Sequence, residues 1–244
     1  MKNYANSIEE LYELYDKGLL SRDSFSIVLP ANGVTLSALK EYHVKDPIWC
    51  INPSAKATLS TLYNMLYRGE FKPSIVHTLK KLNIVYVIVL KDIPFIGIGK
   101  HWNWHRVHGF FGNTCKPVYE DQYLAVFNIS DNYDEKPYNL HIDDLTQTVQ
   151  IRVKDARPLE IVLPLEIHDE ITIVKKSCDV SVPPISLEDY PSGFLTLYIK
   201  PVGKNCEVIV RYNPLEYRVI YTLVLGAEAV IVLIVLKYLI SLGR

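Results

Sequence analysis

The sequence predicts a mixed α+β fold: a small three-layer α/β domain, an antiparallel β-sandwich and one C-terminal transmembrane helix. Three observations support this prediction. Segments with helical spacing of apolar residues alternate with short apolar runs in the first half of the chain. Short β-like segments separated by turn residues follow from Tyr138. The last part of the chain is almost entirely apolar. We place the domains at 1–134, 135–216 and 217–244.

The first domain begins with a predicted helix. Ser7–Glu10 has the pattern of a capping box, and Gly18 is a typical residue beyond a helix end. Phe25–Leu29 predicts a buried strand. Ser54 and Pro73 each suit the first positions of a further helix, and Gly69 lies just beyond the first of these two helices.

A continuous apolar run, Asn83–Leu90, predicts the central strand of this domain, because strands covered on both faces show no polar alternation. Val118–Ile129 predicts an antiparallel hairpin that turns at Glu120, Asp121 and Gln122.

The β-sandwich is predicted from segments of regular spacing, namely Gln147–Val153, Leu159–Leu163, Glu170–Val174, Phe194–Ile199 and Glu207–Tyr212. Cys178 and Cys206 fall in neighbouring parts of this region and can form a disulfide in an oxidising compartment. Unpaired, buried cysteines are the open alternative.

The C-terminal run, Val219–Leu242, is long enough to cross a bilayer as a helix. Its fifteen Leu, Ile and Val residues outweigh the single acid Glu228, at roughly −0.3 to −0.6 kcal/mol each against about +3 kcal/mol. A buried core helix is the alternative. The first residues contain no apolar signal-peptide core, and the charges flanking the run leave its orientation open.

Charge and motifs limit the classes of partner. With 26 basic and 27 acidic residues the net charge is −1, which excludes a large field that would attract nucleic acid. The sequence has neither a phosphate-binding loop nor a complete dinucleotide fingerprint, so we expect no cofactor.

The candidate binding residues lie in the stretch 101–108, which is rich in histidine and tryptophan. On a helix its three histidines would share one face, a spacing compatible with metal ligation, but the Glu of a zincin motif is missing. The aromatic rings favour packing, a protein interface, or contact with a glycan or lipid headgroup. The predicted binding residues are His101, Trp102, Trp104, His105 and His108.

Two further sites are predicted. Asn128 begins an Asn-Ile-Ser glycosylation sequon, which matters only if this part lies outside the cell. In the C-terminal run, Gly226 would allow close helix approach and Glu228 would hydrogen bond to a partner's membrane helices, unless it is simply a protonated, tolerated acid.

Three stretches carry a resemblance to a known family: Leu82–Asp92, Pro117–Phe127, and Gly193–Pro201 with Val208–Pro214. In this order, and with an apolar span following at once, they resemble the extracytoplasmic C-terminal region of YfhO-like and related GT-C-type polytopic membrane glycosyltransferases. Those enzymes place their catalytic acids between many N-terminal membrane helices, which this sequence lacks. The resemblance therefore implies a non-catalytic outer part, located at the cell membrane, and no catalytic residue is carried over.

Three functions compete. The first is a membrane-anchored, extracytoplasmic accessory domain that contacts membrane lipid, glycan or a polytopic membrane protein through its C-terminal helix. The second is an independent envelope protein that interacts through its β-sandwich. The third is a metal-dependent hydrolase built on His101, His105 and His108.

Overall fold

The computed structural model describes residues 2–30, 53–91, 103–130, 136–143, 148–166, 171–182, 193–203 and 205–212. In these residues the fold is mixed α+β, as the sequence predicts, with four helices and three sheets. The helices are α1 (Lys2–Asp16), α3 (Pro53–Arg68), α4 (Pro73–Lys81) and α5 (Trp104–Thr114).

The first sheet has the order β1-β2-β4-β3. Its strands are β1 (Phe25–Leu29), β2 (Ile84–Leu90), β3 (Lys116–Glu120) and β4 (Leu124–Asn128). β1 and β2 are parallel, whereas β4 is antiparallel to both β2 and β3. All seven residues of β2 are buried, which confirms the predicted central strand. The predicted hairpin is confirmed as β3 and β4.

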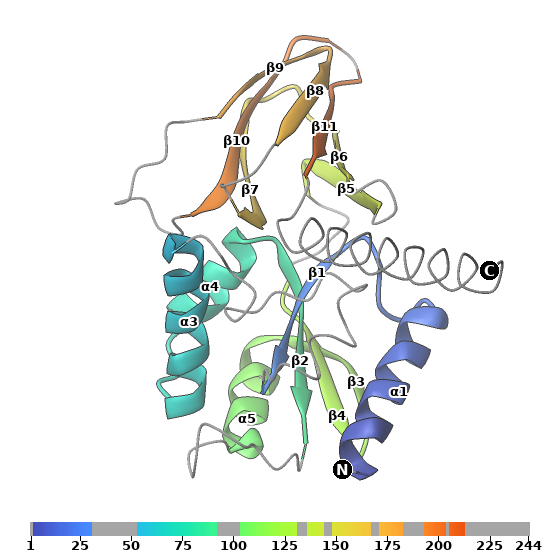
Figure 1. Cartoon of the computed structure of the whole chain (residues 1–244), viewed down its shortest axis with the longest axis vertical. Helices are drawn as coiled ribbons and strands as arrows, with labels where there is room; N and C mark the ends of the chain where they lie inside the picture. Colours follow the sequence, from blue (N-terminus) through green and yellow to red (C-terminus); the bar gives the residue numbers. More distant parts are fainter. Residues whose placement is uncertain are drawn as a thin grey trace, which may run out of the picture.

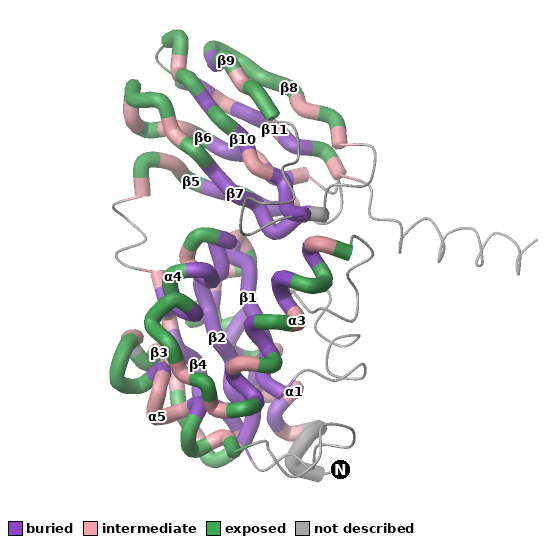
Figure 2. The backbone as a smooth tube through the Cα atoms, turned by 90° about the vertical axis from the view of Figure 1, so that its left-hand side faces the viewer, coloured by how far each residue is buried: buried purple, intermediate pink, exposed green. Residues whose placement is uncertain are grey.

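Helices cover both faces of this sheet (Figure 1). On one face, α1 packs Leu11 and Leu14 against Val28 and Ile88. On the other face, α3, α4 and α5 share a larger core with alternate residues of the same strands. Because helices cover both faces of β2, its sequence is continuously apolar. Figure 2 shows β2 as an unbroken buried segment.

Glycine ends two of the helices as predicted from local sequence. Gly18 adopts φ +69°, and the N–H groups of Gly18 and Leu19 donate to the carbonyls of Tyr15 and Leu14. This pattern is a Schellman motif, which needs a residue that tolerates positive φ. Gly69 ends α3 with the same pattern.

The predicted start of the first helix is wrong. α1 begins at Lys2, so Ser7 lies inside the helix instead of capping it. Ser7 is fully buried, and its hydroxyl donates to the carbonyl of Tyr123 in the β3–β4 turn (3.4 Å). A tertiary partner thus replaces the helix cap that the local pattern suggests.

The second half of the chain forms two antiparallel sheets, ordered β5-β6-β11-β8 and β7-β10-β9. Their strands are β5 (Tyr138–Asp143), β6 (Thr148–Val153), β7 (Leu159–Glu166), β8 (Thr172–Lys176), β9 (Cys178–Ser181), β10 (Phe194–Pro201) and β11 (Glu207–Arg211). Alternate residues of β5, β6, β10 and β11 are buried in one common core. The sequence did not indicate β5 or β9 as strands.

Asn83, just before β2, joins the two halves of the molecule. Its amide nitrogen donates to the carbonyl of Val162 in β7 (2.6 Å), and its oxygen accepts from the hydroxyl of Tyr138 in β5 (2.6 Å) and from Nζ of Lys136 (3.0 Å). Asn83 is only 4% exposed and has φ +56°. One buried carboxamide of the first half therefore satisfies three polar groups of the second half.

Within the described residues, the structure has no helix that is both long and apolar enough to span a bilayer. The predicted membrane span, Val219–Leu242, lies outside the described residues, and so do Gly226 and Glu228.

Candidate functional site

In the histidine- and tryptophan-rich stretch, the structure describes the residues from Asn103 onward. α5 begins at Trp104, after Asn103, whose backbone is extended and whose side-chain oxygen accepts from the N–H of Arg106 (3.3 Å). The single helical face predicted for the three histidines therefore fails, because Asn103 caps the helix after the first of them. His105 and His108 lie on α5, whereas His101 and Trp102 lie outside the described residues.

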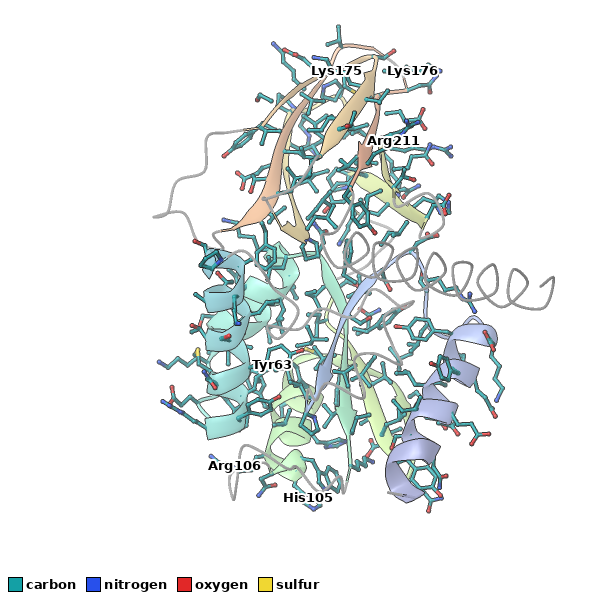
Figure 3. The ribbon with its side chains drawn as sticks, viewed as in Figure 1. Tyr63, His105, Arg106, Lys175, Lys176 and Arg211 are labelled. Carbon is teal, nitrogen blue, oxygen red and sulfur yellow. A yellow bond between two sulfur atoms is a disulfide. The ribbon has the colours of Figure 1, made fainter. Side chains whose placement is uncertain are left out.

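The start of α5 lies at the edge of the first sheet where the parallel strands β1 and β2 end (Figure 1). In open α/β sheets, ligands bind beyond the carboxyl ends of parallel strands. Figure 3 shows His105 and Arg106 at this end of the molecule, opposite Lys175, Lys176 and Arg211. The predicted binding residues on α5, namely Trp104, His105 and His108, thus lie near the edge where a fold of this kind is expected to bind ligands.

Lys91 is the buried charge of this edge. It directly follows β2, and its Nζ donates to a carboxylate oxygen of Glu120 (2.7 Å) and to the carbonyl of Asp121 (2.6 Å). His108 Nε2 lies 3.0 Å from the same carboxylate. Hydrogen bonds from Lys91 and then His108 hold the pKa of Glu120 below its ordinary value. The three side chains form the cluster Lys91–Glu120–His108.

Trp104 packs inside this corner. Its ring stacks on the ring of His105, with centroids 3.7 Å apart, and the ammonium of Lys91 lies 5.1 Å from its centre. His108 meets it edge-on at 6.0 Å. An aromatic ring that binds a sugar needs an open face, and here His105 and Lys91 lie against the ring of Trp104. This geometry favours the packing or interface interpretation over glycan stacking on Trp104.

Arg106 makes the neighbouring contact. Its guanidinium lies 5.6 Å from the centre of the Phe71 ring and directly beside Gly69, where a Cβ would come within 2.8 Å of it. Gly69 therefore serves two purposes, since it ends α3 and leaves room for Arg106. Phe71 in turn stacks on Phe110 of α5 at 5.0 Å.

The charged groups of the cluster Lys91–Glu120–His108 are paired with one another, so they are poorly suited to act as acid or base. The carboxylate of Glu120 accepts from both a lysine and a histidine, so it is a weak base. Among the described residues, no group of three His, Cys, Asp or Glu side chains is arranged to hold a metal ion. His108 has a carboxylate as its partner instead.

The sequence interpretation missed Lys91 and Glu120. A signal was present, because Lys91 is the first charge after an apolar run and therefore sits at the carboxyl end of the central strand. The hairpin around Glu120 was predicted, but the pairing of these two residues depends on strand order β2-β4-β3, which local sequence does not reveal.

The remaining predicted sites lie elsewhere. Asn128 ends β4, and its side-chain oxygen accepts from both the N–H (2.9 Å) and the hydroxyl (2.6 Å) of Ser130, the third residue of the sequon. Cys178 and Cys206, which the sequence left as either paired or unpaired, are joined in a disulfide.

Comparisons with models of protein families, with curated proteins and with solved structures give no match to this chain.

Proposed function

We propose that this chain is a membrane-anchored, extracytoplasmic, non-catalytic accessory module that acts through contacts with protein, glycan or lipid headgroups. In this proposal the residues 1–134 are a small α/β domain, 135–216 a β-sandwich, and 217–244 a transmembrane helix with a short tail. The resemblance to the outer region of GT-C-type glycosyltransferases gives the same assignment.

The observation that carries the proposal is the closed cluster Lys91–Glu120–His108. It occupies the sheet edge where an α/β protein would place catalytic groups, yet each member is held by another. A general base needs an available lone pair and a pKa near the operating pH, whereas the pKa of Glu120 is lowered. A sheet edge closed in this way supports a role in shape and contact.

The disulfide between Cys178 and Cys206 supports an extracytoplasmic location, because disulfides persist mainly in oxidising compartments. The location of the sequon at Asn128, on a partly exposed strand end, is compatible with that side of the membrane.

The membrane assignment rests on the sequence of Val219–Leu242, with Glu228 near its middle. A carboxyl at that depth is stabilised by hydrogen bonds from neighbouring helices, and Gly226 would allow a partner helix to approach closely. The partner expected from this chemistry is a polytopic membrane protein.

Affinity purification in a mild detergent tests the proposal. We expect the full chain to co-purify with a polytopic membrane protein, and Glu228→Leu to reduce its recovery. Val230→Leu is the matched control in the same run and should leave recovery unchanged. Equal recovery with Glu228→Leu, or no membrane partner, would instead favour the independent envelope protein.

A further inference from the structure

A polar cavity of about 490 Å³ lies where the outer face of the β5–β6 hairpin meets the segment after α1. Seven residues line it: Ser21, Asp23, Asn139, Leu140, His141, Gln150 and Arg152. It is far from the sheet edge that holds Lys91, and none of the sequence-predicted binding residues lines it. Its volume lies within the range of small-molecule sites.

The register of the hairpin builds the floor of the cavity. Asn139 pairs with Arg152, and His141 pairs with Gln150, across β5 and β6. These residues alternate with the buried Leu140 and Ile151, so the four polar side chains point to one face. A two-by-two array of polar groups results from strand pairing alone.

Two carboxylates fix the orientation of this array. Asp23 Oδ1 lies 2.8 Å from Nδ1 of His141 and also accepts from the N–H of Ile142 (2.9 Å). Glu207 on β11 accepts hydrogen bonds from the side-chain amide of Gln150 and from Nε of Arg152 (3.2 Å). Within the described residues, Asp23 contacts only one ring nitrogen of His141, and the carboxylate of Glu207 contacts only the amide nitrogen of Gln150 and Nε of Arg152. The other polar atoms of these three side chains face the cavity side of the hairpin.

Several directional groups remain available as a result. Within the described part of the chain, the carboxamide of Asn139, Nε2 of His141, Oε1 of Gln150 and the terminal nitrogens of Arg152 have no hydrogen-bond partner. Held in place by strand pairing and by the two carboxylates, they would lose little conformational entropy on binding a ligand.

The chemistry of these groups selects the ligand. The lining offers both donors and acceptors, and a sugar hydroxyl needs one of each. Glu207 offsets the charge of Arg152, and the carboxylate of Asp23 lies beside His141, so the lining has no excess positive charge to attract a phosphate or carboxylate ligand. The volume suits about one or two pyranose rings. We propose that this cavity binds a neutral glycan.

This inference rests on the proposed function only in treating the chain as a contact module, and it chooses glycan among the three kinds of contact. It does not depend on the membrane orientation or on a partner protein. Recovery of a membrane partner should be the same with and without the cavity residues, so the two proposals can fail separately.

The test is binding of the full chain, reconstituted in phospholipid nanodiscs free of glycoside detergent, to an array of neutral, carboxylated and sulfated glycans. We expect retention on neutral glycans, and about tenfold weaker binding for Asn139→Ala and for Arg152→Ala. Arg157→Ala is the matched control, because Arg157 lies in the β6–β7 turn, pairs with Asp155 and is 84% exposed.

Asn139→Ala protects the test against misfolding, since Asn139 is exposed and its carboxamide makes no hydrogen bond within the described residues. Three results would overturn the inference: retention on acidic glycans only, no retention on any neutral glycan, or equal binding by the wild type and both cavity variants.

Discussion

The ammonium group of Lys91 lies 2.7 Å from the carboxylate of Glu120, and the two side chains differ sharply in exposure, at 7% and 44%. Removing the acid leaves a buried charge without its main partner, so Glu120→Ala should lower the free energy of unfolding by about 1–3 kcal/mol. Glu70→Ala is the control, because within the described ranges Glu70 forms an ion pair only with the exposed Arg68, at 4.0 Å, and it should cost less than about 1 kcal/mol. Urea unfolding of the full chain in detergent measures both. Equal effects would show that the Lys91–Glu120 pair contributes nothing special.

The same pair predicts a pH dependence. Because the pKa of folded Glu120 lies below its ordinary value of 4.5, its contribution to stability is complete above that pH and is lost as the pH falls further. The difference in unfolding free energy between the wild type and Glu120→Gln should therefore shrink steadily below pH 4.5. A difference that stays constant down to pH 3 would contradict this assignment of the Glu120 titration.

Lys136 predicts a second rise of stability with pH, in the alkaline range. Burial lowers its pKa from 10.5 to about 8, so the unfolded chain binds more protons between these values and stability should rise with pH. Burial raises the pKa of the neighbouring Tyr138, which moves the titration of that hydroxyl to higher pH. Lys136→Met should remove this rise, so the free energy of unfolding of the wild type minus that of the variant should increase from pH 7 to pH 10. Lys154→Met is an exposed control close to Pro137, and this variant should still show the rise.

Asn83 predicts how strongly the two halves are coupled. Asn83→Ala would leave the carbonyl of Val162 and the hydroxyl of Tyr138 without their partner, at a cost of about 2–4 kcal/mol. Asn205 has a similar backbone, with φ +76°, but is exposed, so Asn205→Ala isolates the cost of positive φ. Hydrogen exchange should accelerate in β5 and β7 only for Asn83→Ala. Matching effects of the two substitutions would mean that backbone strain, and not the junction, explains the loss.

The disulfide predicts a loss of stability on reduction. Cys178 and Cys206 are 28 residues apart, and the loop-entropy argument gives about 3–4 kcal/mol for a closed loop of that length. Cys178→Ser should lower the unfolding temperature under oxidising conditions and have no effect in reductant. Cys115→Ser leaves the Cys178–Cys206 bridge in place, so its effect on the unfolding temperature should be the same with and without reductant. A wild-type chain whose melting is insensitive to reductant would contradict a structural role for the bridge.

Local sequence predicted the elements with the strongest patterns and failed where a partner distant in sequence decides. β2 was predicted because its burial on both faces leaves an unbroken apolar run, and Gly18 and Gly69 because a Schellman motif requires positive φ. Ser7 has the pattern of a helix cap, but its hydroxyl donates to the carbonyl of Tyr123, and the helix begins earlier, at Lys2.

The candidate site shows the same division. Histidine spacing suggested one helical face, but Asn103 caps α5 between His101 and His105. The groups that decide the chemistry of this edge, Lys91 and Glu120, are 29 residues apart and meet through strand order. The cavity beside β5 was not foreseen either, because β5 itself gave only a weak strand pattern.

Protease treatment of intact cells shows on which side of the membrane the folded part lies. We expect the full chain to sediment with membranes, and we expect added protease to remove its folded part from intact cells without any detergent. The reduced and non-reduced chains should then differ by two alkylatable thiols, those of Cys178 and Cys206. Protection of the soluble part until the cells are lysed, or recovery of the chain in the soluble fraction, would contradict an outward-facing, membrane-anchored contact module.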